Sequence, residues 1–224
     1  MALLHYQPPL SPYIQVVYQD DHILVLDKPS GLLTVPGKAA EHKDSLQLRV
    51  QRVYPEAKIV HRLDMATSGL IVLAFGKPNQ GAIGKQFEKR EVSKTYQALV
   101  WEHIAEDSGT VSLPLICDWP NRPKQMVDHE RGKPATTHWQ VLSRHTDDFG
   151  NSTLVELKPV TGRSHQLRVH MLALGHPILG DRLYAYEQAL QAKPRLQLHA
   201  CQLSFKHPFH GEWMHFESPA PFSL

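Results

Sequence analysis

Residues 61–69 read HRLDMATSG, and the apolar run LIVLAF follows at 70–75. This run has the length and the β-branched content of a buried strand. A short polar loop therefore presents Asp64 just before the chain enters a core. A carboxylate in such a place loses hydration, so it needs a cation or hydrogen-bond donors to stay ionised. The loop by itself is equally compatible with a catalytic aspartate and with a structural ion pair.

Alternating and continuous apolar runs on both sides of this loop predict one mixed α+β domain that is rich in strands. The expected strands lie at 16–18, 23–26, 70–75, 92–101, 135–142, 153–158, 196–205 and 213–216. Asp20 and Asp21 are expected to form the turn between the first two. Residues 1–13 contain three prolines and are expected to form an extended arm, and 14–224 the single domain.

Three segments have the spacing and end signals of helices. The first is expected to begin after Asp44 or Ser45, to place Leu46, Val50 and Val53 on one face, and to stop near Pro55. The second is expected over 79–91, with Ile83 and Phe87 facing inward. The third is expected to begin at Ser164 as its N-cap, to carry Leu167, Met171 and Leu174, and to stop at Gly175. The proline-rich segment 114–134 is expected to be a loop.

Composition narrows the class of protein. The formal net charge is only +2, so no strong basic field indicates nucleic acid. Cys117 and Cys201 form no CxxC pair, which argues against a disulfide scaffold or a cysteine zinc site and favours a reducing cytoplasm. The N-terminus lacks the pattern of a signal peptide, and no apolar run approaches the roughly 20 residues that span a bilayer.

Histidines raise the question of a metal site. His165 and His170 are five residues apart, which places them off one helical face, and the other pairing, His61 with Asp64, has no further ligand nearby in sequence. No HExxH motif occurs. We therefore expect no metal site.

Asp64 needs a partner, and we select Arg168, in the first turns of the third expected helix. An arginine fork would lower the pKa of the aspartate and hold it ionised. The alternative is that Arg168 is an ordinary surface cation. Tyr96, in the middle of a strand, is more often a core residue, but its ring could instead stack on a planar base.

The basic residues could be ordinary solvated surface charge. They could instead form a phosphate-binding surface if the fold brings them together on one face. They are Lys85, Lys89, Arg90, Lys94, Arg122, Lys124, Arg131, Lys133, Arg163 and Arg182. Trp119 lies close to Arg122 and Lys124, a combination that suits RNA because aromatic rings stack on splayed bases.

Several motifs together resemble those of the RluA-type pseudouridine synthases. They are HRLDMATSGLIV at 61–72, KPSGL at 28–32, KTY at 94–96, GRSHQLRVH at 162–170, GHPILGD at 175–181 and LHA at 198–200. They occur in the family's order over roughly residues 14–220. The segment 114–125 resembles the subgroup that modifies a tRNA anticodon stem-loop and a similar stem-loop of 23S rRNA. One departure is Glu102, where relatives often have glycine, and we expect little consequence.

The resemblance implies a role for each matching residue. Asp64 matches the catalytic aspartate, Tyr96 the tyrosine that stacks on the uracil, and Arg168 the arginine paired with the aspartate. Arg62 resembles the residue that enters the RNA stem when the uridine leaves it, and Leu198 is expected beneath the base. We expect Arg163, His165, Trp119, Arg122 and Lys124 to contact RNA.

The resemblance also implies a pseudouridine synthase fold, with a mixed, mostly antiparallel, bent β-sheet and flanking helices. We expect no S4-like module, no cofactor, and a monomeric cytoplasmic enzyme that acts on rRNA and tRNA. Three alternatives remain: a non-catalytic RNA-binding module, an enzyme of the same family that acts on one RNA class, and a retaining glycosidase. The last needs a second carboxylate roughly 5 Å from the first, for which Asp118 and Asp181 are the candidates.

Overall fold

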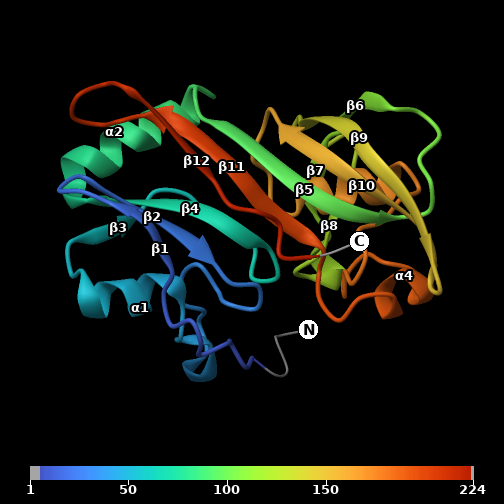
Figure 1. Cartoon of the computed structure of the whole chain (residues 1–224), viewed down its shortest axis with the longest axis horizontal. Helices are drawn as coiled ribbons and strands as arrows, with labels where there is room; N and C mark the ends of the chain where they lie inside the picture. Colours follow the sequence, from blue (N-terminus) through green and yellow to red (C-terminus); the bar gives the residue numbers. More distant parts are fainter. Residues whose placement is uncertain (1–5, 223–224) are drawn as a thin grey trace. The chain divides into compact units, whose positions relative to one another are not determined.

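Strands make up most of the regular structure in the computed structural model, which describes residues 6–222 (Figure 1). The chain divides into two compact units. The N-terminal unit comprises residues 6–94 and 200–220, and the central unit comprises residues 95–199 and 221–222. Each unit combines β-sheet with short helices, which confirms the α+β class.

The strands are β1 (Val16–Gln19), β2 (Ile23–Lys28), β3 (Ala57–Ile59), β4 (Ser68–Phe75), β5 (Ser93–Trp101), β6 (Ser108–Ser112), β7 (Leu115–Cys117), β8 (Gln125–Val127), β9 (Thr136–Asp147), β10 (Gly150–Pro159), β11 (Leu198–Lys206) and β12 (Trp213–Glu217). The α-helices are α1 (Leu46–Val53), α2 (Gly76–Glu88), α3 (Gln166–Ala173) and α4 (Glu187–Gln191), and 3-10 turns are η1 (Ala40–His42) and η2 (Trp119–Asn121).

In the N-terminal unit, β1 and β2 form the predicted antiparallel hairpin, and β2 continues antiparallel to β4. Asp20 closes the hairpin turn, since its Oδ1 accepts the backbone N–H groups of His22 at 2.7 Å and Ile23 at 2.9 Å. β3 also pairs with β4, and β12 pairs with β11. The predicted turn at Asp20 is therefore confirmed.

Strand β4 is buried on both of its faces. Leu70 and Val72 pack in a core cluster with Ile83 of α2, while Ile71 and Leu73, which point the other way, are also fully buried. A strand covered on both sides loses the polar–apolar alternation and shows a continuous apolar run instead. This explains the sequence LIVLAF after the polar loop.

The helices of this unit follow the sequence with small differences. Ser45 caps α1 by accepting the N–H of Leu48 at 3.4 Å, and Leu46 and Val50 are buried. Val53, which shares their face of the helix, is its last residue and has 54% of its surface exposed. Helix α2 starts three residues earlier than expected, at Gly76, and ends at Glu88.

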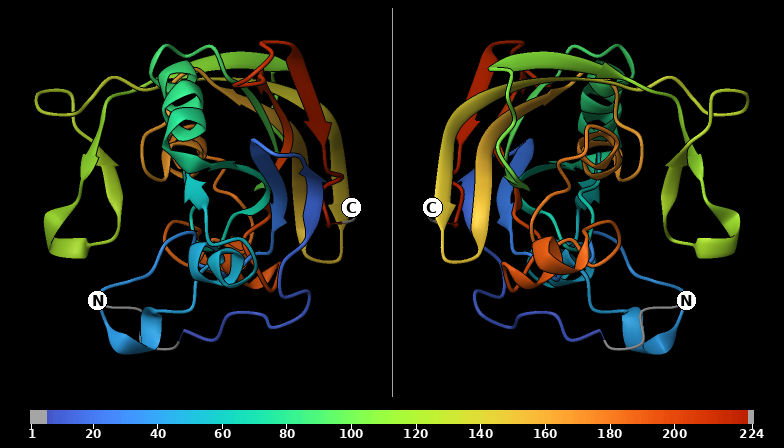
Figure 2. Two further views of the ribbon diagram at one scale, coloured as in Figure 1. Left: turned by 90° about the vertical axis from the view of Figure 1, so that its left-hand side faces the viewer. Right: turned by 90° about the vertical axis from the view of Figure 1, so that its right-hand side faces the viewer.

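In the central unit, β5, β10, β9 and β6 follow one another as an antiparallel sheet. β9 and β10 extend beyond the predicted strands towards their connecting turn, where 143–147 pairs with 150–154. Residues 143–147 are mostly polar and exposed, so no apolar pattern marks them in the sequence. The prediction of a loop over 114–134 is partly wrong, because β7 and β8 form a short antiparallel hairpin within it. Figure 2 shows this hairpin, in yellow-green, extending away from β9 and β10.

Helix α3 begins at Gln166, and its N-cap is His165, in the left-handed conformation at φ 53° and without a side-chain cap. The prediction of Ser164 as the N-cap is therefore wrong. Gly175, at φ 87°, ends the helix region as predicted. Residues 6–13 contain no helix or strand, while residues 1–5 of the expected arm lie outside the described residues. Between residues 6 and 222, no helix combines the length and hydropathy needed to cross a membrane.

Candidate active site

The backbone of the loop 61–69 is fixed by the segment that follows β2. Lys28 is fully buried, and its ammonium donates to the carbonyls of Met65 at 3.1 Å, Pro29 at 2.9 Å and Leu32 at 2.8 Å. Ser30 Oγ donates to the carbonyl of the next loop residue, Ala66, at 2.6 Å. The KPSGL motif therefore holds the loop through its carbonyl oxygens.

The remaining carbonyls near the aspartate are also bonded. Thr34 Oγ1 donates to the carbonyl of Leu63 at 2.7 Å and accepts its N–H at 3.2 Å. The carbonyl of Asp64 accepts the N–H of Thr67 at 3.1 Å, which closes a turn. With its backbone bonded on both sides, Asp64 has a fixed position in this unit. Sequence reasoning gave Lys28, Ser30 and Thr34 no role in holding the loop, because the loop residues to which they bond lie 29 to 37 residues away in the chain.

Gly69 ends the loop at a place where no other residue fits. Its φ of +112° is a conformation that residues with a Cβ rarely adopt, and an added Cβ would lie 2.4 Å from the carbonyl oxygen of Ala200 and 2.5 Å from its nitrogen. Ala200 belongs to β11, which neighbours β4 in the sheet. The glycine therefore allows β11 to approach the strand that carries the loop.

His61 has a structural role within the same unit. Its Nε2 accepts the N–H of Val72 at 3.1 Å, and its ring stacks on Phe87 with centroids 4.6 Å apart. Burial, reinforced by the nearby charge of Lys94, lowers the pKa of His61 to about 3. The imidazole is neutral at pH 7 and satisfies a backbone donor of β4.

The predicted site residues are distributed between the two units. Arg62 is exposed and Asp64 is half-buried in the N-terminal unit. Tyr96, Arg168 and Leu198 belong to the central unit. Tyr96 is half-buried on β5 opposite Leu157 of β10, and Leu198 is buried at the start of β11.

Arg168 is not a surface cation, because only 5% of its side chain is exposed. Its Nε and Nη2 bond to the two carboxylate oxygens of Asp181 at 2.7 and 2.6 Å, and its guanidinium carbon lies 5.0 Å from the ring centroid of Tyr184. This bidentate pair was missed from the sequence, although Asp181 lies in a quoted motif. The pairing of Arg168 with Asp64 stays a prediction.

His165 and His170 are engaged in different interactions. His165 Nδ1 pairs with the hydroxyl of Tyr184 at 2.7 Å, whereas His170 pairs with Thr137 Oγ1 at 3.0 Å and with the carbonyl of Leu113 at 3.2 Å. Burial lowers the pKa of His170. Within residues 6–222, no group of three or more His, Cys, Asp or Glu side chains is arranged to hold a metal ion.

The β7–β8 hairpin carries three of the predicted RNA-contact residues, Trp119, Arg122 and Lys124, near its turn. Trp119 is 64% exposed, and the guanidinium of Arg122 lies 4.3 Å from its ring centroid. Lys124 is half-buried beside them, and Arg163, outside the hairpin, is exposed and donates to the carbonyl of Pro134 at 3.2 Å. A stacked arginine–tryptophan pair offers both a cation and a flat surface.

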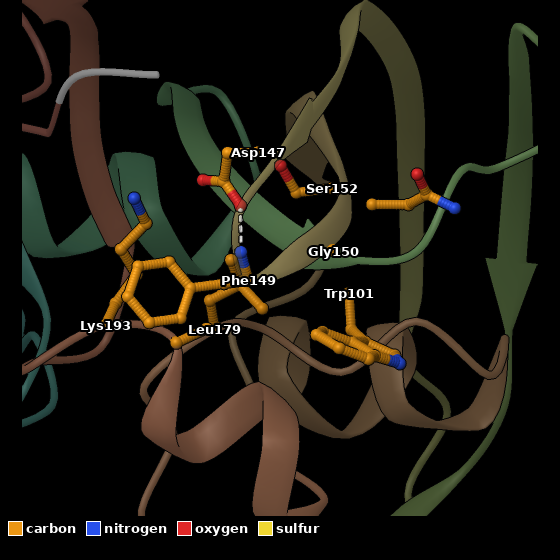
Figure 3. Close-up of a pocket in the computed structure, with 9 residues that line it drawn as sticks. Trp101, Asp147, Phe149, Gly150, Ser152, Leu179 and Lys193 are labelled. Atoms are coloured by element: carbon orange, nitrogen blue, oxygen red, sulfur yellow. Dashed lines mark hydrogen bonds between the residues drawn. The ribbon is translucent and has the colours of Figure 1, made fainter.

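A shallow hollow in the central unit lies at the β9–β10 turn (Figure 3). Trp101, Phe149 and Leu179 give it an apolar lining, and the N–H of Phe149 donates to Asp147 at 2.9 Å. None of the predicted site residues lines it.

Comparisons with known proteins agree with these motifs. The family model described as RNA pseudouridylate synthase matches residues 22–173. A relative from Escherichia coli O6:H1, "Dual-specificity RNA pseudouridine synthase RluA", is 57% identical over 222 residues, which are 99% of this chain and 100% of the relative. The protein of the same name from Yersinia pestis is 60% identical over 207 residues, 92% of this chain and 99% of the relative. Among solved structures, "Human RNA Pseudouridylate Synthase Domain Containing 1" has a TM-score of 0.79 and 32% identity over 94% of this chain and 84% of that chain.

Proposed function

Because the chain belongs to the RNA pseudouridylate synthase family and is an RNA pseudouridine synthase, we propose that it isomerises uridines in a tRNA anticodon stem-loop and in a similar stem-loop of 23S rRNA. The relatives' names, which describe a dual-specificity enzyme, and the segment 114–125 support two RNA substrates. We propose that it does so as a monomer in the cytoplasm and without a cofactor.

The observation that carries the site assignment is the fixed backbone around Asp64. Bonds from Lys28, Ser30 and Thr34 hold the carbonyls on both sides of the residue. A catalytic group must be held in position before the substrate arrives, because small displacements are costly in rate. These bonds therefore support a chemical role for Asp64.

The reaction breaks the N1–C1′ bond of uridine and forms a C5–C1′ bond. The hydrogen on C5 leaves to solvent, and N1 gains a proton, so no redox agent or group donor is required. The target nucleotide must leave the stem-loop, at roughly a few kcal/mol. Phosphate contacts and the entry of Arg62 into the vacated space offset this cost.

Within the site, Asp64 acts on the flipped nucleotide. A carboxylate there can attack C1′, attack C6 of the base, or remove a sugar proton. Tyr96 and Leu198 enclose the detached uracil so that it rotates without escaping. We assign to Arg168 the pairing with the aspartate that the family resemblance implies; within its own unit its Nε and Nη2 donate to Asp181.

The test is Asp64→Asn, with Asp148→Asn as the matched control because Asp148 is exposed in the β9–β10 turn. The first variant should bind both RNA stem-loops and release no hydrogen from C5 of uridine, and the control should retain full activity. Turnover by Asp64→Asn would refute the catalytic assignment. A wild-type protein that releases hydrogen from only one of the two stem-loops would refute dual specificity.

A further inference from the structure

We propose that Tyr184 is a positioning residue that links the RNA-contacting β7–β8 hairpin to His165 and Arg168 at the start of α3. This inference rests on the proposed function, since it assumes that the hairpin binds the substrate RNA. It assigns to one buried hydroxyl the task of connecting recognition with the arginine of the active site.

The first half of the link joins Tyr184 to the hairpin. Its hydroxyl accepts the backbone N–H of Gln125 at 2.7 Å, and Gln125 pairs with Cys117 across β8 and β7. The exposed Trp119–Arg122 pair lies in the turn between these strands. An isolated two-stranded hairpin is only marginally stable, so its orientation depends on such tertiary contacts.

The second half joins Tyr184 to the start of α3. The same hydroxyl pairs with His165 Nδ1 at 2.7 Å, and the two rings meet edge to face with centroids 5.7 Å apart. The ring of Tyr184 also lies under the guanidinium of Arg168, 5.0 Å from its carbon. Hydroxyl and ring therefore each contact a predicted site residue.

Asp181 organises the segment that carries Tyr184. Its carboxylate binds Arg168 through both oxygens and also accepts the N–H groups of Leu183 at 2.9 Å and Tyr184 at 3.3 Å. The position of Tyr184 is thus tied to that of the arginine by the same carboxylate. A displacement of the hairpin at Gln125 is therefore passed to His165, the N-cap of α3, and to Arg168 within the helix.

This geometry predicts that RNA contact at the hairpin affects the chemical step as well as binding. RNA stacked on Trp119 and Arg122 fixes the hairpin, the hairpin fixes the hydroxyl of Tyr184, and the hydroxyl fixes His165 beside Arg168. Because catalysis is sensitive to small errors of orientation, loosening this link lowers kcat more than it raises KM.

Tyr184→Phe removes the hydroxyl and keeps the ring under Arg168. Because the hydroxyl's bonds to Gln125 and His165 are both lost, we expect kcat for release of the C5 hydrogen to fall by about tenfold, with KM changed by less than about threefold. Tyr186→Phe is the matched control, since Tyr186 lies two residues away and is exposed, and it should leave both constants unchanged. A kcat equal to that of the control would overturn the proposal.

A double-mutant cycle separates positioning from a merely structural role. If the link exists, the loss of kcat caused by Arg122→Ala should shrink by about threefold or more in the Tyr184→Phe background, because the two changes interrupt one path. Additive effects of the two substitutions would overturn the inference. Circular dichroism and thermal unfolding establish that each variant is folded.

Hydrogen exchange on the wild-type protein tests the same link without relying on the folding of Tyr184→Phe. RNA binding should increase protection of residues 115–127 and of 163–168 together, and Arg122→Ala should reduce both gains. Gains that vary independently would count against the link. A wild-type protein without pseudouridine synthesis would instead refute the proposed function, so the two failures are distinguishable.

Discussion

Replacing Lys28 with methionine should both destabilise the protein and slow its reaction. The side chain is fully buried, and its ammonium bonds to the carbonyls of Pro29, Leu32 and Met65 at 2.8 to 3.1 Å. Methionine has a similar volume but no donor. The substitution therefore removes hydrogen bonds while leaving the packing almost unchanged.

The magnitude follows from what each carbonyl loses. Met65 keeps the N–H of Gly31 at 2.8 Å, whereas the bonds from Lys28 to Pro29 and Leu32 disappear. Leaving a buried acceptor unsatisfied costs about 1–3 kcal/mol, and removing the cost of burying an ammonium offsets part of this. We expect the free energy of unfolding to fall by about 2–4 kcal/mol.

Urea unfolding measures this loss, and release of the C5 hydrogen at a temperature where the variant is folded measures the effect on kcat. Because Met65 follows Asp64 directly, kcat should fall together with stability. Lys77→Met, at an exposed position, is the control and should stay within about 0.5 kcal/mol of the wild type. A loss no larger than that of the control, or a full kcat in the folded variant, would refute the reasoning.

Substitutions at three further positions test other contacts. Gly69→Ala should lower the free energy of unfolding by about 3 kcal/mol or more, because its Cβ would clash with the backbone of Ala200; a loss under 1 kcal/mol in thermal unfolding would contradict this. Glu102 has a φ of 64°, so Glu102→Gly should be more stable than Glu102→Ala by about 1–2 kcal/mol. Both variants lose the hydrogen bond to Asn151, and only glycine relieves the backbone strain. Equal free energies of unfolding for the two variants would exclude strain at this position. His61 has a pKa lowered to about 3, so between pH 6.5 and 3 the unfolded state binds a proton that the native state does not. The stability that neutral His61 contributes should be fully present above pH 6.5, and on acidification the free energy of unfolding should fall by at most about 1.4 kcal/mol per pH unit. Unfolding curves of His61→Gln should show a weaker dependence of this free energy on pH than those of the wild type.

Local patterns predicted much of the fold correctly. The continuous apolar run of β4, the Asp20 turn and the cap at Ser45 depend on residues near one another in the chain. Patterns failed where distant contacts decide the outcome. The hairpin within 114–134 has strands of only three residues, stabilised by contacts such as that of Gln125 with Tyr184, and no periodicity signals strands that short.

Glu102 illustrates the same limit at a single residue. The family resemblance led us to expect glycine at this position, but only the backbone shows that the position is left-handed. Its carboxylate accepts a bond from Asn151 at 3.0 Å, and its carbonyl accepts one from Thr153 at 2.8 Å. These bonds help to hold a residue with a Cβ in a conformation that glycine adopts more readily.

Motifs and apolar patterns were sufficient to predict the family, the strand that follows the loop and Asp64 as the candidate catalytic residue. These features are encoded in residue order, through motifs and apolar periodicity. How the loop is held became visible only in the folded chain: Lys28 and Thr34 bond to its carbonyls, and Gly69 allows the backbone of Ala200 to approach. Such contacts join residues about 30 to 130 positions apart, and their formation depends on how the strands pack, which local preferences do not specify.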